Sequence, residues 1–211
     1  MDAGPLSQAE ARQWPRHRVR PVTHLKNIEP SSRLLFVSEL KREAAIARGP
    51  DTLSICGSDA SLCAKLAETT GPLRLTISFG LCGGLDPALQ SGDIVIGTQV
   101  LAGGGAIKAD ESVSRELAAR LGAAGERVSL GAVVGADAPV LTRGAKAKLR
   151  NATMAVAVDM QSQIVARFAA DRKGPFAILR VVSDPANRDL PPLVIETQAS
   201  TNNNPQLRPP R

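Results

Sequence analysis

The chain is poor in the residues that build aromatic and histidine sites. Its 211 residues include no tyrosine and one tryptophan, and aromatic residues make up 2%. The sequence therefore argues against a stacking platform for single-stranded nucleic acid. The only two histidines, His17 and His24, both lie near the N-terminus, which excludes a His-based triad or a His-rich metal site in the rest of the chain.

Cysteines and long apolar runs are scarce as well. The three cysteines, Cys56, Cys63 and Cys82, lack the paired spacing of a metal site. An odd number of scattered thiols favours a reducing compartment, so we expect a cytoplasmic protein. The longest apolar runs fall far short of the ~20 residues that a membrane helix needs, so no integral membrane segment is predicted.

What the chain does have is enough apolar sequence for one core. Hydrophobic residues make up 43%, and a chain of this length can bury roughly 70% of its unfolded surface. The formal charge of +6 comes partly from residues 1–33, which carry six Lys/Arg and three Asp/Glu. We predict an irregular basic arm over 1–33, a folded domain over 34–188 and a disordered or truncated tail over 189–211. A basic arm without a motif does not predict nucleic acid as a partner.

From Leu34 onward, short apolar runs alternate with helical patterns. The predicted strands cover residues 34–37, 52–56, 74–79, 93–101, 127–134, 153–158 and 176–182. The predicted helices cover residues 40–48, 58–69, 111–122, 142–150 and 161–172, with Ser58 and Ser112 as candidate N-caps. This alternation predicts an α/β three-layer sandwich with a central, mostly parallel mixed sheet. No covering helix is predicted at the C-terminus, where a three-layer domain normally has one.

Four predicted strand ends carry residues suited to chemistry. They are Glu43, the glycine segment GLCGGLDP (80–87), Asp159-Met160-Gln161-Ser162 and Ser183-Asp184-Pro185. Ligands of open α/β sheets bind beyond the carboxyl ends of the strands. We therefore expect all four to face one edge of the sheet.

Each strand end also has a purely structural interpretation. The glycines could form a tight strand exit, because their spacing fits neither the phosphate loop nor the dinucleotide fingerprint. Glu43 could be a solvated glutamate favoured by the helix dipole. Asp159 could cap the next helix, and Asp184-Pro185 is a standard N-cap and N1 pair. Their shared position at one sheet edge favours a functional site.

The order of these motifs resembles the nucleoside phosphorylase superfamily. The likeness runs from about Leu34 to Asn187 and is carried by GLCGGLDPALQSGDIVIG, VVGADAPV, AVDMQSQIVARFA and FAILRVVSDPAN. Within the superfamily the chain is similar to 5′-methylthioadenosine/S-adenosylhomocysteine nucleosidases, and in particular to the hopanoid-associated phosphorylases, whose members begin near GLKREA. The resemblance implies cleavage of the N-ribosidic bond of an adenine nucleoside, either adenosylhopane-like or methylthioadenosine-like.

The resemblance also implies roles for individual residues. Asp184 would be the general acid that meets adenine N7, and Glu43 would activate the attacking water. Gln161 would contact the ribose hydroxyls, because the ribosyl cation of the transition state needs an acceptor nearby. Asp159 would support the site. The other implied substrate-binding residues are Leu81, Cys82, Gly83, Gly84, Pro139, Val140, Met160 and Ser183.

Departures from the family pattern leave an alternative open. Gln161 stands where the family has Glu, and a neutral amide offers no charge to a cationic transition state. Glu39 stands where relatives commonly have Gly, and Pro139 where the family often has an aromatic residue. A non-catalytic or degenerate nucleoside-binding homologue is therefore the main alternative. A generic nucleotide-binding α/β domain has less support, since its fingerprints are missing.

The nucleophile is either water or phosphate. Purine phosphorylases of the superfamily usually carry an Arg just before the glycine segment, where this chain has Ser78 and Phe79. Arg42 and Arg180 are the remaining candidates to hold a phosphate, and we favour water. No cofactor or metal is implied, with phosphate as the alternative co-substrate. The expected partners are a small-molecule adenine nucleoside and further copies of the chain in a homo-oligomer.

Overall fold

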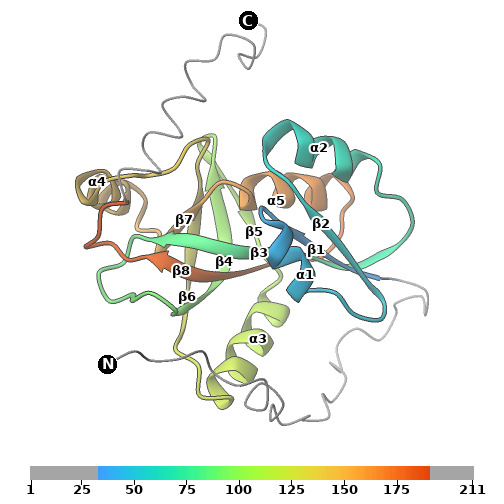
Figure 1. Cartoon of the computed structure of the whole chain (residues 1–211), viewed down its shortest axis with the longest axis horizontal. Coiled ribbons are helices and arrows are strands. Elements are labelled where there is room, and N and C mark those ends of the chain that lie inside the picture. The colour runs from blue at the N-terminus through green and yellow to red at the C-terminus, as the bar shows by residue number, and fades with distance from the viewer. Residues whose placement is uncertain (1–32, 191–211) are drawn as a thin grey trace, which may run out of the picture.

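The structure is a computed structural model that describes residues 33–190 (Figure 1). The predicted basic arm and C-terminal tail lie outside the described residues, apart from Arg33, Asp189 and Leu190. The segment in which no covering helix is predicted lies outside them too. The strands are β1 (Arg33–Ser38), β2 (Thr52–Cys56), β3 (Leu73–Gly84), β4 (Ile94–Ala102), β5 (Gly105–Lys108), β6 (Val128–Gly135), β7 (Ala157–Asp159) and β8 (Phe176–Asp184). The helices are α1 (Lys41–Ile46), α2 (Asp59–Ala67), α3 (Glu111–Ala123), α4 (Arg143–Thr153) and α5 (Ser162–Asp171).

The strands form one mixed sheet in which parallel pairs predominate. Its order is β2-β1-β3-β7-β6-β4-β5, and β8 pairs with both β3 and β4. The pairs β1–β2, β1–β3, β3–β8, β4–β6 and β6–β7 are parallel, whereas β3–β7, β4–β5 and β4–β8 are antiparallel. Because β8 bridges β3 and β4, the pairing closes β3, β8, β4, β6 and β7 into a ring. This closure brings the ends of β3, β7 and β8 together.

Helices cover both faces of the sheet. Figure 1 shows α2 and α5 together on one side and α3 on the other. The apolar residues of β1 alternate between these layers, since successive strand residues point to opposite faces. Leu35 and Val37 belong to the core with α2 and α5, whereas Leu34 and Phe36 pack with the cluster that contains Val113 of α3. The predicted α/β fold with helices on a mostly parallel mixed sheet is thereby confirmed.

Three local predictions differ from the structure. The glycine segment that was expected to leave the sheet continues β3 as far as Gly84, because β7 and β8 supply pairing partners there. The hairpin strand β5 was not predicted, although the positive φ angles of Gly103 and Gly104 suit a tight hairpin turn. Helix α3 is capped by Asp110, whose carboxylate accepts a hydrogen bond from Val113 N, and not by Ser112.

Among the described residues, no helix combines the length and the apolar character needed to cross a bilayer.

Candidate active site

A cavity of about 260 Å³ lies where β3, β7 and β8 end. Every sequence-predicted site residue lines it except Glu43 and Gly84. The lining also includes residues that the motifs did not mark for the site. The complete lining is Glu39, Leu81, Cys82, Gly83, Ala138, Pro139, Val140, Val158, Asp159, Met160, Gln161, Ser183, Asp184 and Leu190.

Gly83 is the point at which the strand ends meet. It pairs with Val158 on β7 and with Asp184 on β8. A Cβ atom at this position would lie 3.2 Å from Asp184 Oδ2 and 3.3 Å from Val158 Cγ1. A glycine here therefore lets the Asp184 carboxylate approach the backbone of β3, which a larger residue would obstruct.

Glu43 lies next to the cavity without lining it. Its Oε2 accepts hydrogen bonds from Glu39 N (3.1 Å) and Leu40 N (2.9 Å), and its Oε1 accepts one from Leu81 N (3.0 Å). Gly80 makes this possible, because its φ is +144° and a Cβ there would lie 2.7 Å from Glu43 Oε1. Glu43 is 8% exposed, so the solvated-glutamate interpretation is wrong. Its carboxylate joins the start of α1 to β3.

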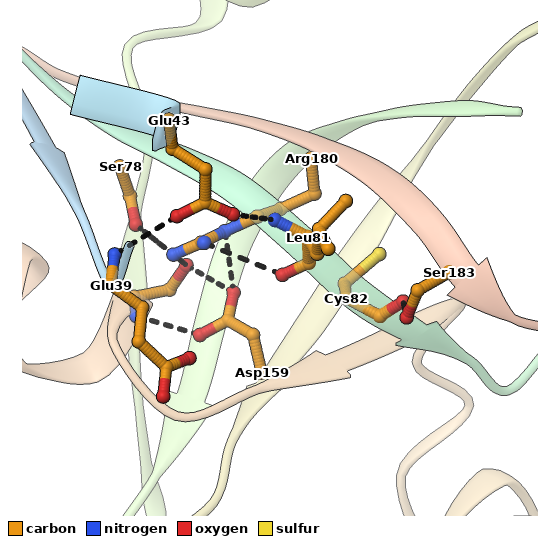
Figure 2. A network of polar contacts seen from close by, with 9 residues as sticks. Glu39, Glu43, Ser78, Leu81, Cys82, Asp159, Arg180 and Ser183 are labelled. Carbon is orange, nitrogen blue, oxygen red and sulfur yellow. Dashed lines mark hydrogen bonds and ion pairs between the residues drawn. The ribbon is translucent and has the colours of Figure 1, made fainter. Parts of the chain in front are cut away.

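The floor of the site is a buried network around Asp159 and Arg180 (Figure 2). Asp159 Oδ1 accepts a hydrogen bond from Ser162 N at 2.7 Å, and Oδ2 accepts one from Ser162 Oγ at 2.5 Å. Arg180 Nε lies 2.9 Å from Asp159 Oδ2. That contact is an ion pair without hydrogen-bond geometry, and within the described part of the chain this Nε–H has no hydrogen-bond partner. Asp159 thus caps α5, as its structural interpretation proposed, and also neutralises a buried cation.

The guanidinium of Arg180 is engaged on its remaining side as well. Arg180 donates to Ser78 Oγ, to Ser162 Oγ at 3.2 Å and to the Leu81 carbonyl at 3.4 Å. The hydroxyls of Ser78 and Ser162 lie 3.0 Å apart. Arg180 is fully buried beneath the cavity and does not line it. Arg42, the other candidate for a phosphate, is exposed on α1.

Asp184 meets a second buried cation, Lys146 of α4. The Lys146 Nζ lies 2.7 Å from Asp184 Oδ2, and the lysine side chain is fully buried. On the other side, Ser183 Oγ contacts Asp184 Oδ1 and lies 3.1 Å from the Cys82 carbonyl. No helix begins after Asp184 within the described residues, so the N-cap interpretation of Asp184-Pro185 is wrong. Instead, a turn follows in which Arg188 N donates to the Pro185 carbonyl.

The side-chain amide of Gln161 lies at the cavity without a hydrogen-bond partner among the described residues. The residue is 2% exposed and lines the cavity, and its side chain caps no backbone group of α5. Its amide makes no hydrogen bond to any residue between 33 and 190. Buried polar groups are normally hydrogen-bonded, so this amide suits a ligand with hydroxyl groups.

Cys82 also lines the cavity, but its environment makes the thiol unreactive. Burial raises the pKa of Cys82, and the negative charge of Asp159 raises it further, against the opposing effect of Arg180. Asp184 adds a smaller effect in the raising direction. Because the thiolate is the nucleophilic form of cysteine, Cys82 contributes its shape to the cavity and not a nucleophile.

The charge of the lining is one-sided. Its described residues include three carboxylates, Glu39, Asp159 and Asp184, and neither lysine nor arginine. The two cations of the site, Lys146 and Arg180, lie behind the carboxylates they pair with. These cations offset the charges of Asp184 and Asp159, so the described lining carries little net charge and presents no cation to an anion.

Of the two cations behind the lining, the sequence analysis named Arg180 only as a candidate phosphate ligand and did not mark Lys146. Arg180 had a signal, since a single arginine inside a continuous apolar strand must be buried and paired. Lys146 had none, because Lys146, Lys148 and Arg150 follow one another on α4 with the same spacing. Only the packing of α4 against the turn after β8 buries Lys146 and leaves Lys148 exposed.

Comparison with known proteins gives a consistent picture. Solved structures with a similar fold include the 5′-methylthioadenosine/S-adenosyl homocysteine nucleosidase of Campylobacter jejuni (TM-score 0.64, 18% identity, covering 75% of this chain and 88% of that chain). They also include the 5′-methylthioadenosine/S-adenosylhomocysteine nucleosidase of Neisseria meningitidis in complex with methylthio-immucillin-A (TM-score 0.62, 22%, 74% and 87%). A third is the futalosine hydrolase of Helicobacter pylori (TM-score 0.64, 15%, 74% and 86%).

At these identities the likeness establishes the fold. No curated protein matches the sequence. The phosphorylase superfamily, however, matches residues 18–204. That match spans most of the chain, and the chain therefore belongs to the phosphorylase superfamily.

Proposed function

We propose that the chain cleaves the N-ribosidic bond of an adenine nucleoside with water and releases adenine. The observation that carries the proposal is the cavity itself, in which Asp184, Asp159 and Gln161 meet at the ends of β7 and β8, two strands that both pair with β3. With Asp184 protonated, Glu39 and Asp159 are the carboxylates of the described lining that can stabilise the positive charge of a ribosyl transition state. The nucleosidase names of similar folds support the same reaction class.

The reaction needs one proton for the base and one water for the sugar. The bond from C1′ to N9 breaks, its electron pair passes to the adenine, and protonated Asp184 donates its proton to N7. The water oxygen bonds to C1′, and the proton released by the water restores Asp184. Acid catalysis of this kind contributes typically ~10²–10⁴-fold in rate.

The attacking water requires a carboxylate that reaches the cavity. Glu43 does not line the cavity, so the role that its motif position implied lacks support from its place in the structure, and its oxygens accept three backbone N–H groups. Glu39, at the start of the same segment, does line the cavity. We assign the orientation of the water to Glu39 and the support of Leu81 to Glu43.

Water, not phosphate, is the proposed nucleophile. A phosphate needs fixed cations or a nest of backbone amides. Arg180 is paired with Asp159 and Arg42 is exposed on α1, so neither presents a cation to the cavity. An incoming phosphate would instead face Glu39, Asp159 and Asp184.

The 5′ substituent of the substrate is proposed to be apolar. Leu81, Val140, Met160 and Leu190 all line the cavity, and Leu81 is 46% exposed. An apolar surface of this kind fits a methylthio group or a hopane tail and offers nothing to a charged substituent.

A nucleoside-binding homologue without turnover is the second candidate. Gln161 favours it, because the amide can accept a hydrogen bond from a sugar hydroxyl but supplies no charge to the transition state. The ion pair of Asp184 with Lys146 favours it too, because the carboxylate then serves as the partner of a buried cation and not as an acid. This candidate predicts affinity for adenine nucleosides without release of adenine.

One assay separates these possibilities. Methylthioadenosine and a hopanyl analogue are incubated with the chain, with and without inorganic phosphate, and free adenine is measured by chromatography. We expect adenine release without phosphate and no gain on its addition. Release that depends on phosphate would overturn the choice of water. Binding of methylthioadenosine by calorimetry without release would select the second candidate, and neither binding nor release of either nucleoside would overturn the proposal.

A further inference from the structure

Gln163 is a buried glutamine of α5 to which no motif assigns a role. It is 7% exposed and does not line the cavity. Its Nε2 donates hydrogen bonds to the Ala136 carbonyl at 3.1 Å and to Asp137 Oδ1 at 2.9 Å. A side-chain amide has two N–H donors. Both donors are therefore directed at the two residues that follow β6.

The end of β6 allows α5 to come close enough for these contacts. Gly135 is the last residue of β6, and a Cβ atom there would lie 2.5 Å from Gln163 Cβ. A larger residue at this position would push α5 away from the strand end, whereas glycine permits the close approach. The short distance lets the glutamine side chain reach past the strand to the loop beyond it.

The loop continues into residues 138–140, which form one wall of the cavity and are called the wall segment below. Ala136, two residues before this segment, is held from both sides. Its N–H donates to the Asp159 carbonyl at 2.8 Å, and its carbonyl accepts the hydrogen bond from Gln163. Asp137 is exposed, and the second hydrogen bond of Gln163 fixes its carboxylate against α5. Gln163 thus holds the chain where it enters the wall segment.

The position of the wall segment matters because its side chains are aliphatic. Ala138, Pro139 and Val140 offer a ligand dispersion contacts and no aromatic ring on which to stack. A gap of ~0.5–1 Å between two surfaces already loses a quarter to a half of the dispersion attraction. A small shift of the wall segment would therefore weaken its contact with a flat base.

We propose that Gln163 is a positioning residue that holds the wall segment against the base of a bound nucleoside and so sets affinity. This proposal rests on the proposed function in that the cavity takes an adenine nucleoside. The base would contact the wall segment in the ground state and in the transition state alike. Loss of such uniform binding raises KM and leaves kcat nearly unchanged.

The direct test is the binding of adenine to the full chain, measured by isothermal titration calorimetry without any turnover. Gln163→Leu removes both donors, and we expect adenine to bind about tenfold more weakly. The control is Gln90→Leu, which changes an exposed glutamine outside the cavity and should leave the affinity unchanged. A folded Gln163→Leu chain with the affinity of the unsubstituted chain would overturn the proposal.

A rescue experiment tests whether the effect passes through Asp137. Gln163→Glu keeps the length of the side chain but replaces its donors with a carboxylate, which would face another carboxylate and a carbonyl. Binding should weaken at least as much as in Gln163→Leu. Adding Asp137→Asn gives the new carboxylate a donor and should restore part of the affinity. No recovery in the double variant would overturn the role of this contact.

A variant at the exposed partner protects the test against misfolding. If Gln163→Leu does not fold, Asp137→Ala removes one of the two hydrogen bonds and leaves the buried glutamine in place. Adenine should then bind more weakly than in the unsubstituted chain, by a smaller factor than in Gln163→Leu. Unchanged affinity in Asp137→Ala would overturn the proposal in that case.

Turnover separates a role in binding from a role in the chemical step. In Gln163→Leu the KM for methylthioadenosine should rise about tenfold, and kcat should change by less than about threefold. An equal fall in kcat and kcat/KM would overturn the assignment to binding. A chain that binds adenine with this dependence on Gln163 but releases none would overturn the proposed turnover and support the role of Gln163.

Amide hydrogen exchange judges Gln163 even if adenine does not bind. The Ala136 N–H, which donates to the Asp159 carbonyl, should exchange faster in Gln163→Leu than in the unsubstituted chain. The Val133 N–H, in the middle of β6, serves as the internal reference and should exchange at the same rate in both. Equal exchange of Ala136 in the two chains would overturn the claim that Gln163 holds this loop.

Discussion

The two buried ion pairs of the site differ in one respect, the exposure of their carboxylates. In the pair of Asp159 with Arg180, the side chains are 2% and 0% exposed. In the pair of Asp184 with Lys146, the carboxylate is 12% exposed and the lysine 0%. Both cations lie behind the cavity lining, so the difference comes from the carboxylates. The first pair joins β7, α5 and β8 as structure, and the second presents an oriented carboxylate to a ligand.

The largest effect is expected from Asp184→Asn. The amide cannot donate the proton that the departing base needs, so adenine release should fall by ~10²–10⁴-fold. Stability should change less than in the corresponding change at Asp159, because Lys146 keeps its three carbonyl acceptors. Rates from chromatography of adenine and a urea unfolding curve measure the two effects. Full activity of the Asp184→Asn chain would contradict the role of Asp184 as the acid, and both ion pairs would then be structural.

The matching change at Asp159 should act on stability. Asp159→Asn leaves the fully buried Arg180 without its counter-charge. Breaking a buried pair from one side costs roughly 3–5 kcal/mol in the free energy of unfolding. Urea denaturation checks this value, with Asp189→Asn as a control at an exposed position. A loss of stability no greater than in the control would mean that the Asp159 pair has no structural role.

Gln161→Glu adds a negative charge to the cavity, at a position where the side-chain amide makes no hydrogen bond within the described part of the chain. Charged hydrogen bonds are worth ~1.5–3 kcal/mol against ~0.5–1.5 for neutral ones, so kcat for adenine release should rise about tenfold. Asn151→Asp, which adds the same charge on an exposed face of α4, is the control. A folded Gln161→Glu chain without any gain would show that residue 161 does not face the ribose.

The smallest effect concerns an ion pair away from the cavity. Hydrogen bonds from the Arg127 side chain hold the pKa of Asp93 below its ordinary value, against an opposing effect of burial, and Gln90 N adds a further hydrogen bond. A lowered pKa in the folded state stabilises the fold above the unfolded pKa of ~3.9, and that stability is lost as pH falls through the folded pKa.

Arg127→Gln should therefore lower the free energy of unfolding slightly near neutral pH. Arg127 is largely exposed, so solvent screening keeps the effect small. The difference from the unsubstituted chain should vanish at a pH well below ~3.9, where Asp93 is protonated in both states. Unfolding curves at several pH values check the trend. A difference that persists unchanged in acid would show that Arg127 acts through packing and not through Asp93.

The strand ends could be predicted from the sequence, whereas most contacts of the residues behind the cavity could not. Continuous apolar runs mark β1, β2, β4, β6 and β8, because strands covered on both faces are apolar at every position. The ends of β7 and β8 therefore placed Asp159, Gln161 and Asp184 at one edge, and the structure brings all three to the cavity. The pattern on its own could not show that β3 continues through its glycines, since pairing with β7 and β8 decides this.

The positions of Glu43 and Lys146 depend on contacts between distant parts of the chain, which the sequence pattern does not show. Glu43 was expected at the cavity, but the φ of Gly80 turns Leu81 N toward its carboxylate, a local geometry that no spacing encodes. Lys146 is indistinguishable from Lys148 until α4 is packed against the turn after β8. Long-range packing of this kind joins residues far apart in the chain, 38 positions for Lys146 and Asp184 and 102 for Arg180 and Ser78.

The most direct test of the account is a crystal structure of the chain with adenine. We predict adenine in the cavity between β3, β7 and β8, with N7 within hydrogen-bond distance, ~2.7–3.2 Å, of the Asp184 carboxyl group. The sugar side of the base should face Gln161. Adenine bound elsewhere, or a cavity that stays empty at saturating adenine, would contradict the account.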